Sequence, residues 1–141
     1  MMKKKVIILS VILVAIIGII TVHYLNNRKA FVLDLKIINN KNISLKMGNK
    51  DADIVESKDE NIVIDVLNKK RKTFKDSVSD YPVGGFYVIE INVTLSNDSK
   101  LILYAYEKNK KYYLEKPYDG IYDISKDEYD SIFDVYFKNK I

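Results

Sequence analysis

Residues 86–115 read FYVIEINVTLSNDSKLILYAYEKNKKYYLE, and this stretch carries the clearest structural pattern of the chain. Apolar and polar side chains alternate along three segments, 86–95, 100–108 and 111–116, as they do in strands that bury one face. Short turns rich in Asn, Asp and Lys separate the segments, so we expect an antiparallel meander. One face of the first strand is expected to carry Tyr87, Ile89, Ile91, Val93 and Leu95.

Two short motifs on either side of the meander predict helices. Ser57-Lys-Asp-Glu60 and Ser125-Lys-Asp-Glu128 have the spacing of a capping box, in which the serine accepts from the N3 amide and the glutamate reaches back. Apolar residues follow both motifs at helical spacing. We expect the first helix to end near Lys70 and to bury Ile62, Val63, Val66 and Leu67, and the last helix to bury Tyr129, Ile132, Phe133, Tyr136 and Phe137.

Weaker patterns complete the predicted sheet. Residues 31–38 and 43–47 alternate around a polar turn at 39–42, which indicates a hairpin. Residues 121–124 are expected to form a short edge strand, and 71–85, which lacks periodicity and contains a proline and two glycines, a loop. The sequence therefore predicts an α+β fold: a small antiparallel sheet of about five or six strands, in the order ββαβββα, with two helices packed on one face.

An apolar segment from Val6 to Leu25 precedes this domain. It holds about 20 residues without a permanent charge and, as a helix, would span about 30 Å, the thickness of a bilayer's hydrocarbon core. A cleaved signal peptide is the alternative, but its apolar region is shorter, about 7 to 15 residues, and leads to an A-x-A-like site. The small residue just downstream, Ala30, follows Arg28 by two positions and fits such a site badly. We therefore expect an uncleaved signal anchor.

Flanking charges predict the orientation of this anchor. Lys3–Lys5 and the N-terminal amine outweigh Arg28 and Lys29, so the N-terminus should stay in the cytoplasm. The protein is thus expected in the cell membrane as a single-pass protein whose C-terminal domain is extracytoplasmic. The expected divisions are a cytoplasmic Lys-rich stub and transmembrane signal anchor over 1–25, a linker over 26–30, and an extracytoplasmic α+β domain over 31–141.

The charge balance argues against nucleic acid as a partner. The net charge is +4, with 23 Lys and Arg against 19 Asp and Glu, but Lys3–Lys5 lie outside the predicted domain. The rest of the chain is close to neutral, whereas a nucleic-acid-binding domain carries its excess positive charge in the folded part. The predicted partners are the membrane and either an envelope protein or an anionic cell-wall polymer.

Side chains that commonly carry catalysis are scarce. The chain has no cysteine and one histidine, His23, at the predicted membrane boundary. Thiol chemistry, cysteine zinc sites and the usual neutral-pH base are therefore missing from the domain. No G-x-S-x-G, S-x-x-K or phosphate-loop motif occurs. The acids of Asp51-Ala-Asp53 and of 119–130 do not follow the EF-hand order and are interpreted as solvated. We expect no enzyme activity, no cofactor and no bound metal.

A basic run, Lys69-Lys-Arg-Lys72 with Lys75 close behind, is the sharpest local charge feature. Basic residues at a helix end meet the negative pole of its dipole, which is the plainer interpretation. The functional alternative is a surface for anionic envelope polymers or lipid headgroups, acting within about a Debye length. The residues of this candidate anionic-surface site are Lys69, Lys70, Arg71, Lys72 and Lys75.

Tyrosine is abundant, with 11 copies, several of them in the meander. Tyrosines in strands commonly pack against cross-strand neighbours, which is the plainer interpretation. The alternative is a solvent-facing aromatic band that binds a glycan or a protein, because aromatic residues concentrate in recognition surfaces. The residues of this candidate aromatic surface are Tyr104, Tyr106, Tyr112 and Tyr113.

Three stretches in this order, SKDENIVIDVLN (57–68), the meander and YDISKDEYDSIFD (122–134), resemble a small domain of unknown function found in Firmicute membrane-anchored proteins and lipoproteins. The resemblance covers roughly residues 31–138 and implies the α+β fold, but no catalytic or ligand residues. This chain has a helix where lipoprotein relatives would have an acylated cysteine. Frequent Ile, Lys, Asn and Tyr, whose codons are AT-rich, also point to a low-GC bacterium.

These observations predict an extracytoplasmic interaction module that is held near the membrane and recognises a protein or envelope component without catalysis. A small membrane-bound immunity or inhibitor protein is a second hypothesis, which a neighbouring toxin gene would favour. A carboxylate-based envelope hydrolase is a third, and it requires two acids that converge in a cleft.

Overall fold

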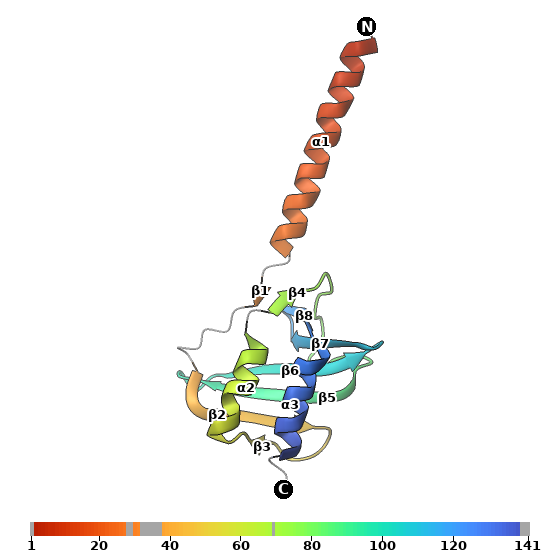
Figure 1. Cartoon of the computed structure of the whole chain (residues 1–141). Helices are drawn as coiled ribbons and strands as arrows, with labels where there is room; N and C mark the ends of the chain where they lie inside the picture. Colours follow the sequence, from red (N-terminus) through yellow and green to blue (C-terminus); the bar gives the residue numbers. More distant parts are fainter. Residues whose placement is uncertain (1, 28–29, 32–37, 69, 139–141) are drawn as a thin grey trace.

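The computed structural model describes residues 2–27, 30–31, 38–68 and 70–138, with side chains for 6–25, 43–68 and 70–138. Helix α1 (Met2–Asn27) extends alone from one end of a domain. In that domain α2 (Ser57–Leu67) and α3 (Lys126–Lys138) lie side by side over one face of a sheet (Figure 1). The predicted α+β class, with two helices on one face, is therefore confirmed.

The described residues form a sheet of eight strands in the spatial order β1-β4-β8-β7-β6-β5-β2-β3, and all neighbours are antiparallel. The prediction of five or six strands was too low, because three of the strands hold only two or three residues and show no alternation. The strands are β1 (Ala30–Phe31), β2 (Ile38–Met47), β3 (Asp53–Ile54), β4 (Lys70–Lys72), β5 (Phe86–Leu95), β6 (Lys100–Lys108), β7 (Lys111–Lys116) and β8 (Gly120–Ile124).

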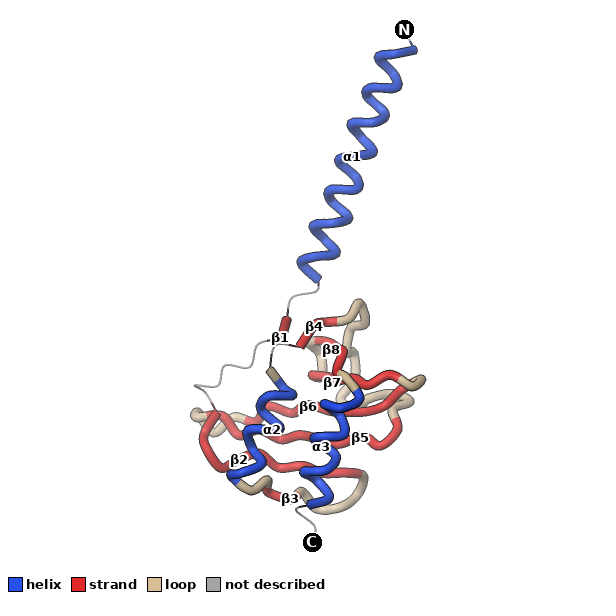
Figure 2. Tube along the Cα trace, viewed as in Figure 1, coloured by secondary structure: helices blue, strands red, loops and turns tan. Residues whose placement is uncertain are grey.

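The predicted meander is confirmed, and β5, β6 and β7 have the predicted bounds. Asn109 and Lys110 have φ values of 55° and 60°, as a two-residue hairpin turn of the primed type requires. β8 adds a fourth antiparallel strand and begins one residue earlier than predicted, at Gly120. Figure 2 shows β5 and β6 crossing behind the two helices, with β7 and β8 following on the side of α1.

The predicted hairpin of 31–38 with 43–47 is wrong over the part that the structure describes. β2 runs through the expected turn at 39–42 and pairs with β3 and β5, whereas residues 32–37 lie outside the described part. Pairing with the most apolar strand replaces the local turn, with only a register shift after Ile38. Apolar residues then meet across the pair: Ile43 opposite Val93, Leu45 opposite Ile91 and Met47 opposite Ile89.

The main core lies between the sheet and the two helices. Val63, Val66 and Leu67 of α2 and Tyr129, Ile132, Val135 and Tyr136 of α3 are buried there against the apolar residues of β2, β5, β6 and β7. Ile62 and Phe137, both predicted to be buried, are 40% and 44% exposed because they lie at the edge of each helix's apolar face. Phe137 instead packs on Phe133 and Tyr136 of its own helix.

The two predicted capping boxes have different outcomes. At α3 the Glu128 amide donates to Ser125 Oγ at 3.1 Å, and the Ser125 amide donates to Glu128 Oε2 at 2.7 Å, so this box is confirmed. At α2 the N-cap is Glu56, whose carbonyl accepts from the Asp59 and Glu60 amides, and Ser57 is already helical. α2 also ends at Leu67, before the predicted Lys70, because the chain enters β4 there.

Tyr87 departs from the predicted face of β5. The register with β6 shifts between Phe86 and Ile89, Tyr87 has φ +48°, and its side chain is 68% exposed. Such a bulge adds a residue to one strand and turns its side chain outward. The Tyr87 carbonyl accepts a 2.6 Å hydrogen bond from the Tyr129 hydroxyl, which ties the bulge to α3.

α1 is long and apolar enough to cross a membrane. Its segment Val6–Leu25 has a mean hydropathy of 2.9, and none of it is buried inside the protein. By length and composition this helix fits a membrane anchor or a signal sequence. The predicted linker over 26–30 overlaps the end of α1 at Asn27 and the start of β1 at Ala30; residues 28 and 29 lie outside the described part.

Candidate functional site

The sheet face opposite the helices is covered on one half only, by the β4–β5 loop (73–85). This loop lies against β6: the Tyr81 ring packs on the Tyr104 ring with centroids 5.2 Å apart, and Lys108 Nζ donates to the Val83 carbonyl at 2.6 Å. A Cβ atom at Gly85 would stand 2.9 Å from Tyr106 Cδ2, so this close approach requires glycine. Over β2 and β5, no other described residues cover the remaining half.

The covered half contains most of the predicted aromatic surface. Tyr104, Tyr106 and Tyr113 are at most 7% exposed and form a second apolar cluster with Val88. Tyr112 points to the opposite face and packs on Tyr129 of α3, with centroids 5.2 Å apart. The four tyrosines therefore form no solvent-facing band, because strand alternation divides them between two packed faces.

Glu115 of β7 fastens the covering loop from beneath. Its side chain is buried, and it accepts hydrogen bonds from the Ser77 hydroxyl at 2.6 Å and the Tyr106 hydroxyl at 2.8 Å. Burial, together with the hydrogen bond to Glu115, raises the pKa of Tyr106 well above its ordinary value, so Tyr106 stays a donor. The buried carboxylate of Glu115 on β7 thus joins the β4–β5 loop to β6 and β7.

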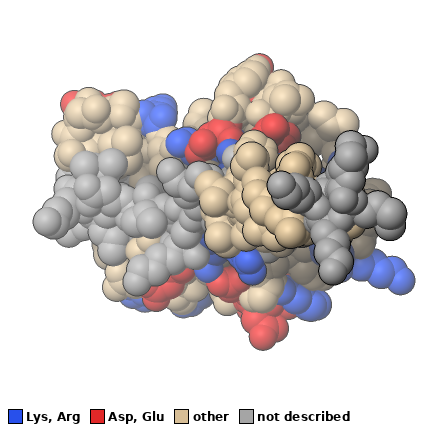
Figure 3. Space-filling model, turned by 90° about the horizontal axis from the view of Figure 1, so that it is seen from above, with Lys and Arg blue, Asp and Glu red and all other residues tan. Residues whose placement is uncertain are grey.

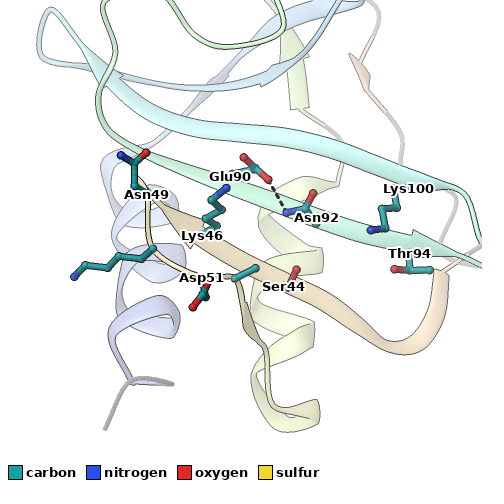
Figure 4. A pocket seen from close by; sticks show the side chains of 10 residues that line it. Ser44, Lys46, Asn49, Asp51, Glu90, Asn92, Thr94 and Lys100 are labelled. Atoms are coloured by element: carbon teal, nitrogen blue, oxygen red, sulfur yellow. Dashed lines mark hydrogen bonds between the residues drawn. The ribbon is translucent and has the colours of Figure 1, made fainter.

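The open half forms a polar trough with a volume of about 400 Å³. Strand alternation creates it: Ser44 and Lys46 of β2 and Glu90, Asn92 and Thr94 of β5 line the trough, while their neighbours Ile43, Leu45, Ile89 and Ile91 face the core. The β2–β3 turn closes one side and Lys100 of β6 stands at another (Figure 4). The lining residues are Ser44, Lys46, Asn49, Lys50, Asp51, Ala52, Glu90, Asn92, Thr94 and Lys100.

The described residues that line the trough offer charges and hydrogen-bonding groups, and none of them is aromatic. Three lysines face two acids, and one of these acids, Glu90, already accepts a 2.9 Å hydrogen bond from Asn92 Nδ2. In Figure 4 the Asp51 carboxylate points away from Glu90, with Lys46 between them. The trough therefore presents free ammonium, hydroxyl and amide groups rather than a converging pair of carboxylates.

The predicted anionic-surface residues that the structure describes fall into two pairs, one held by other groups of the domain and one exposed. Lys70 forms an ion pair with Glu128, and Lys72 Nζ donates to the Asp119 carbonyl at 2.6 Å. Arg71 and Lys75 are exposed, and Lys69 lies outside the described residues. The helix-dipole interpretation is wrong, because α2 ends before the run and has no basic residue in its last turn.

Two acids that hold the β4 and β8 region together are ionised more readily than usual. Burial raises the pKa of Glu128, but hydrogen bonds from Lys70 and Ser125 outweigh it and hold the pKa below its ordinary value. The pKa of Asp119 is lowered in the same way, with burial opposed by hydrogen bonds from Lys116 and Tyr122. In the described part of the chain, no three acids or histidines are arranged to hold a metal ion.

Together these features define the class of the molecule: a small α+β domain behind one apolar helix, with a polar trough on the open half of its sheet. The chain belongs to the family described as "Domain of unknown function (DUF5300)", whose profile, DUF5301, matches residues 26–123. The match includes β1 to β7 and most of β8, but not α3. No curated protein and no solved structure matches the chain significantly.

Proposed function

We propose that this protein is a single-pass, membrane-anchored interaction module of a low-GC Gram-positive bacterium. Its domain lies outside the cytoplasm and binds an anionic cell-wall polymer in the polar trough, without catalysis. The anchor is supported by the length and full exposure of the apolar segment Val6–Leu25. The outward orientation is supported by the positive residues Lys3–Lys5 before that segment.

The composition of the trough is the observation that carries this function. Lys46, Lys50 and Lys100 supply cations for phosphate or carboxylate groups, and Ser44, Thr94 and Asn49 supply partners for hydroxyl groups. A protein partner would instead favour aromatic or arginine anchors, and no described residue that lines the trough is of either kind. The separation of Asp51 from Glu90 supports binding without hydrolysis, since carboxylate-based hydrolysis needs two acids at a shared bond.

The first test uses the triple variant K46Q/K50Q/K100Q of the full chain, placed in nanodiscs, and a poly(glycerol phosphate) polymer as the ligand. We expect the variant to bind the polymer about tenfold more weakly than the parent, because the three ion pairs between these lysines and the polymer together contribute about 1–2 kcal/mol. Titration calorimetry measures this, and the parent affinity should fall as salt is added. The matched control K58Q/K111Q/K126Q removes three exposed lysines outside the trough and should bind like the parent.

Two results would overturn the proposal: a parent protein that does not bind the polymer, or a K46Q/K50Q/K100Q variant with the parent's affinity. Circular dichroism melting of both triple variants checks that the fold is unchanged. Surface substitutions of this kind change the free energy of unfolding by about 0.5 kcal/mol or less.

A further inference from the structure

The end of the domain nearest α1 carries a basic and aromatic segment, Arg71–Lys75. Arg71 belongs to β4 and lies opposite Ala30 of β1. Ala30 follows Asn27, the last residue of α1, by three positions, so at most about 10 Å of chain separates them. Backbone pairing therefore holds Arg71 close to the point where α1 ends.

A second contact joins the same two parts through side chains. The Tyr24 ring of α1 packs on the Phe74 ring with centroids 4.8 Å apart. Tyr24 lies at the end of the apolar segment Val6–Leu25, where tyrosines of membrane helices lie at the level of the lipid headgroups. Phe74 is still 59% exposed, so an aromatic ring at headgroup level has most of its surface available.

The basic residues on either side of Phe74, Arg71 and Lys75, are the described members of the basic run that can meet a ligand. Lys70 and Lys72 are held by Glu128 and by the Asp119 carbonyl. Arg71 and Lys75 are exposed, and neither forms an ion pair with a residue that the structure describes. Lys75 Nζ stands 5.3 Å from the centroid of the Tyr113 ring, which leaves its charge unneutralised. Figure 3, which views the molecule from above, shows basic and acidic side chains intermixed on this side.

We propose that Arg71, Phe74 and Lys75 form a docking surface for the anionic phospholipid headgroups of the membrane that α1 crosses. The ring enters the interface beside Tyr24, and the guanidinium and ammonium groups meet lipid phosphates. This inference rests on the proposed function, since it requires α1 to lie in the membrane.

If Arg71, Phe74 and Lys75 lie on the membrane, the order of the strands fixes how far the trough stands from the membrane. Three strand-to-strand steps lead from β4 to β6, in the order β4-β8-β7-β6, and a fourth leads to β5. At about 4.8 Å a step, the trough begins at Lys100 of β6, roughly 15 Å farther from the membrane than β4. In Figure 1 the strands follow one another away from α1 in this way. The lipid surface and the polymer site are therefore at separate places and are tested separately.

Because the chain has no cysteine, single positions can be labelled specifically. The test uses three full-length single-cysteine variants, F74C, V22C and D98C, each labelled with an environment-sensitive NBD fluorophore. Each variant is placed in nanodiscs of phosphatidylglycerol and phosphatidylcholine. The nanodiscs also contain lipid that is spin-labelled at the headgroup and quenches a fluorophore at that depth. We expect quenching to remove about half of the emission at position 74 and at position 22, which lie in the interface, and little at position 98, in the distant β5–β6 turn.

Quenching at 22 with none at 74 would overturn the docking surface and leave the anchor of the proposed function intact. Absence of quenching at 22 would overturn both, because α1 would then not be inserted. The charges are tested by adding R71Q/K75Q to the F74C protein. Quenching at 74 should fall in these nanodiscs and stay unchanged with the matched pair K110Q/K111Q; equal quenching in both variants would show that the cations bind no lipid.

Discussion

Replacement of Ile132 by alanine is expected to lower the free energy of unfolding by about 3 kcal/mol, the middle of the range for a fully buried isoleucine. Ile132 is 0% exposed in the centre of α3, between Tyr129 and Tyr136 on the face that covers the sheet. The family profile ends at residue 123, before this helix. A large loss at Ile132 would show that α3 completes the core of the domain and is not an appended segment.

Urea unfolding of the full chain in detergent, followed by tyrosine fluorescence or near-ultraviolet circular dichroism, measures this loss. Asp134→Ala is the matched control, because Asp134 lies exposed on the same helix; its free energy of unfolding should stay within about 0.5 kcal/mol of the parent. A loss below about 1 kcal/mol for I132A would contradict the packing of α3 described above.

Replacement of Glu115 by alanine is the second substitution with a large expected effect, also about 3 kcal/mol. It leaves the buried hydroxyls of Ser77 and Tyr106 without their acceptor and opens a cavity beneath the β4–β5 loop. The loop should then detach from the sheet more often, so a protease should cut within 73–85 faster than in the parent.

Limited proteolysis and urea unfolding together test this assignment. Asp123→Ala removes an exposed acid from the neighbouring strand β8 and should change neither result. If E115A kept both the parent's stability and its resistance to the protease, Glu115 would not be the group that fastens the loop.

The elements that could be predicted well are those whose sequence patterns depend on neighbouring residues. β5, β6 and β7 have long alternating patterns joined by tight turns, and α3 has a complete capping box, so neighbouring residues alone determine them. The early strands were predicted less well. β2 bypasses its local turn to pair with β5, about fifty residues later in the chain, and no local pattern announces that partner.

The candidate site was missed for the same reason. Ser44 and Lys46 meet Asn92 and Glu90 only once β2 and β5 pair. The outward positions 90, 92 and 94 of the strongest strand are all polar, which was the available sign of an open face. The predicted aromatic surface was wrong for a different reason. Strand alternation shows which tyrosines share a face of the sheet, but the β4–β5 loop that covers one face has no periodicity from which its position could be inferred.

The proposed function requires that the trough face the outside of the cell and hold an anionic wall polymer there. The most direct measurement is the rate at which a membrane-impermeant maleimide labels Asn49→Cys, at the exposed rim of the trough, in intact cells. We expect labelling of Asn49→Cys from outside, at a rate that rises once the polymer is removed enzymatically, whereas the rate at Lys111→Cys should not change. Labelling only after the membrane is permeabilised, or a rate at Asn49→Cys that does not respond to removal of the polymer, would contradict the proposed function.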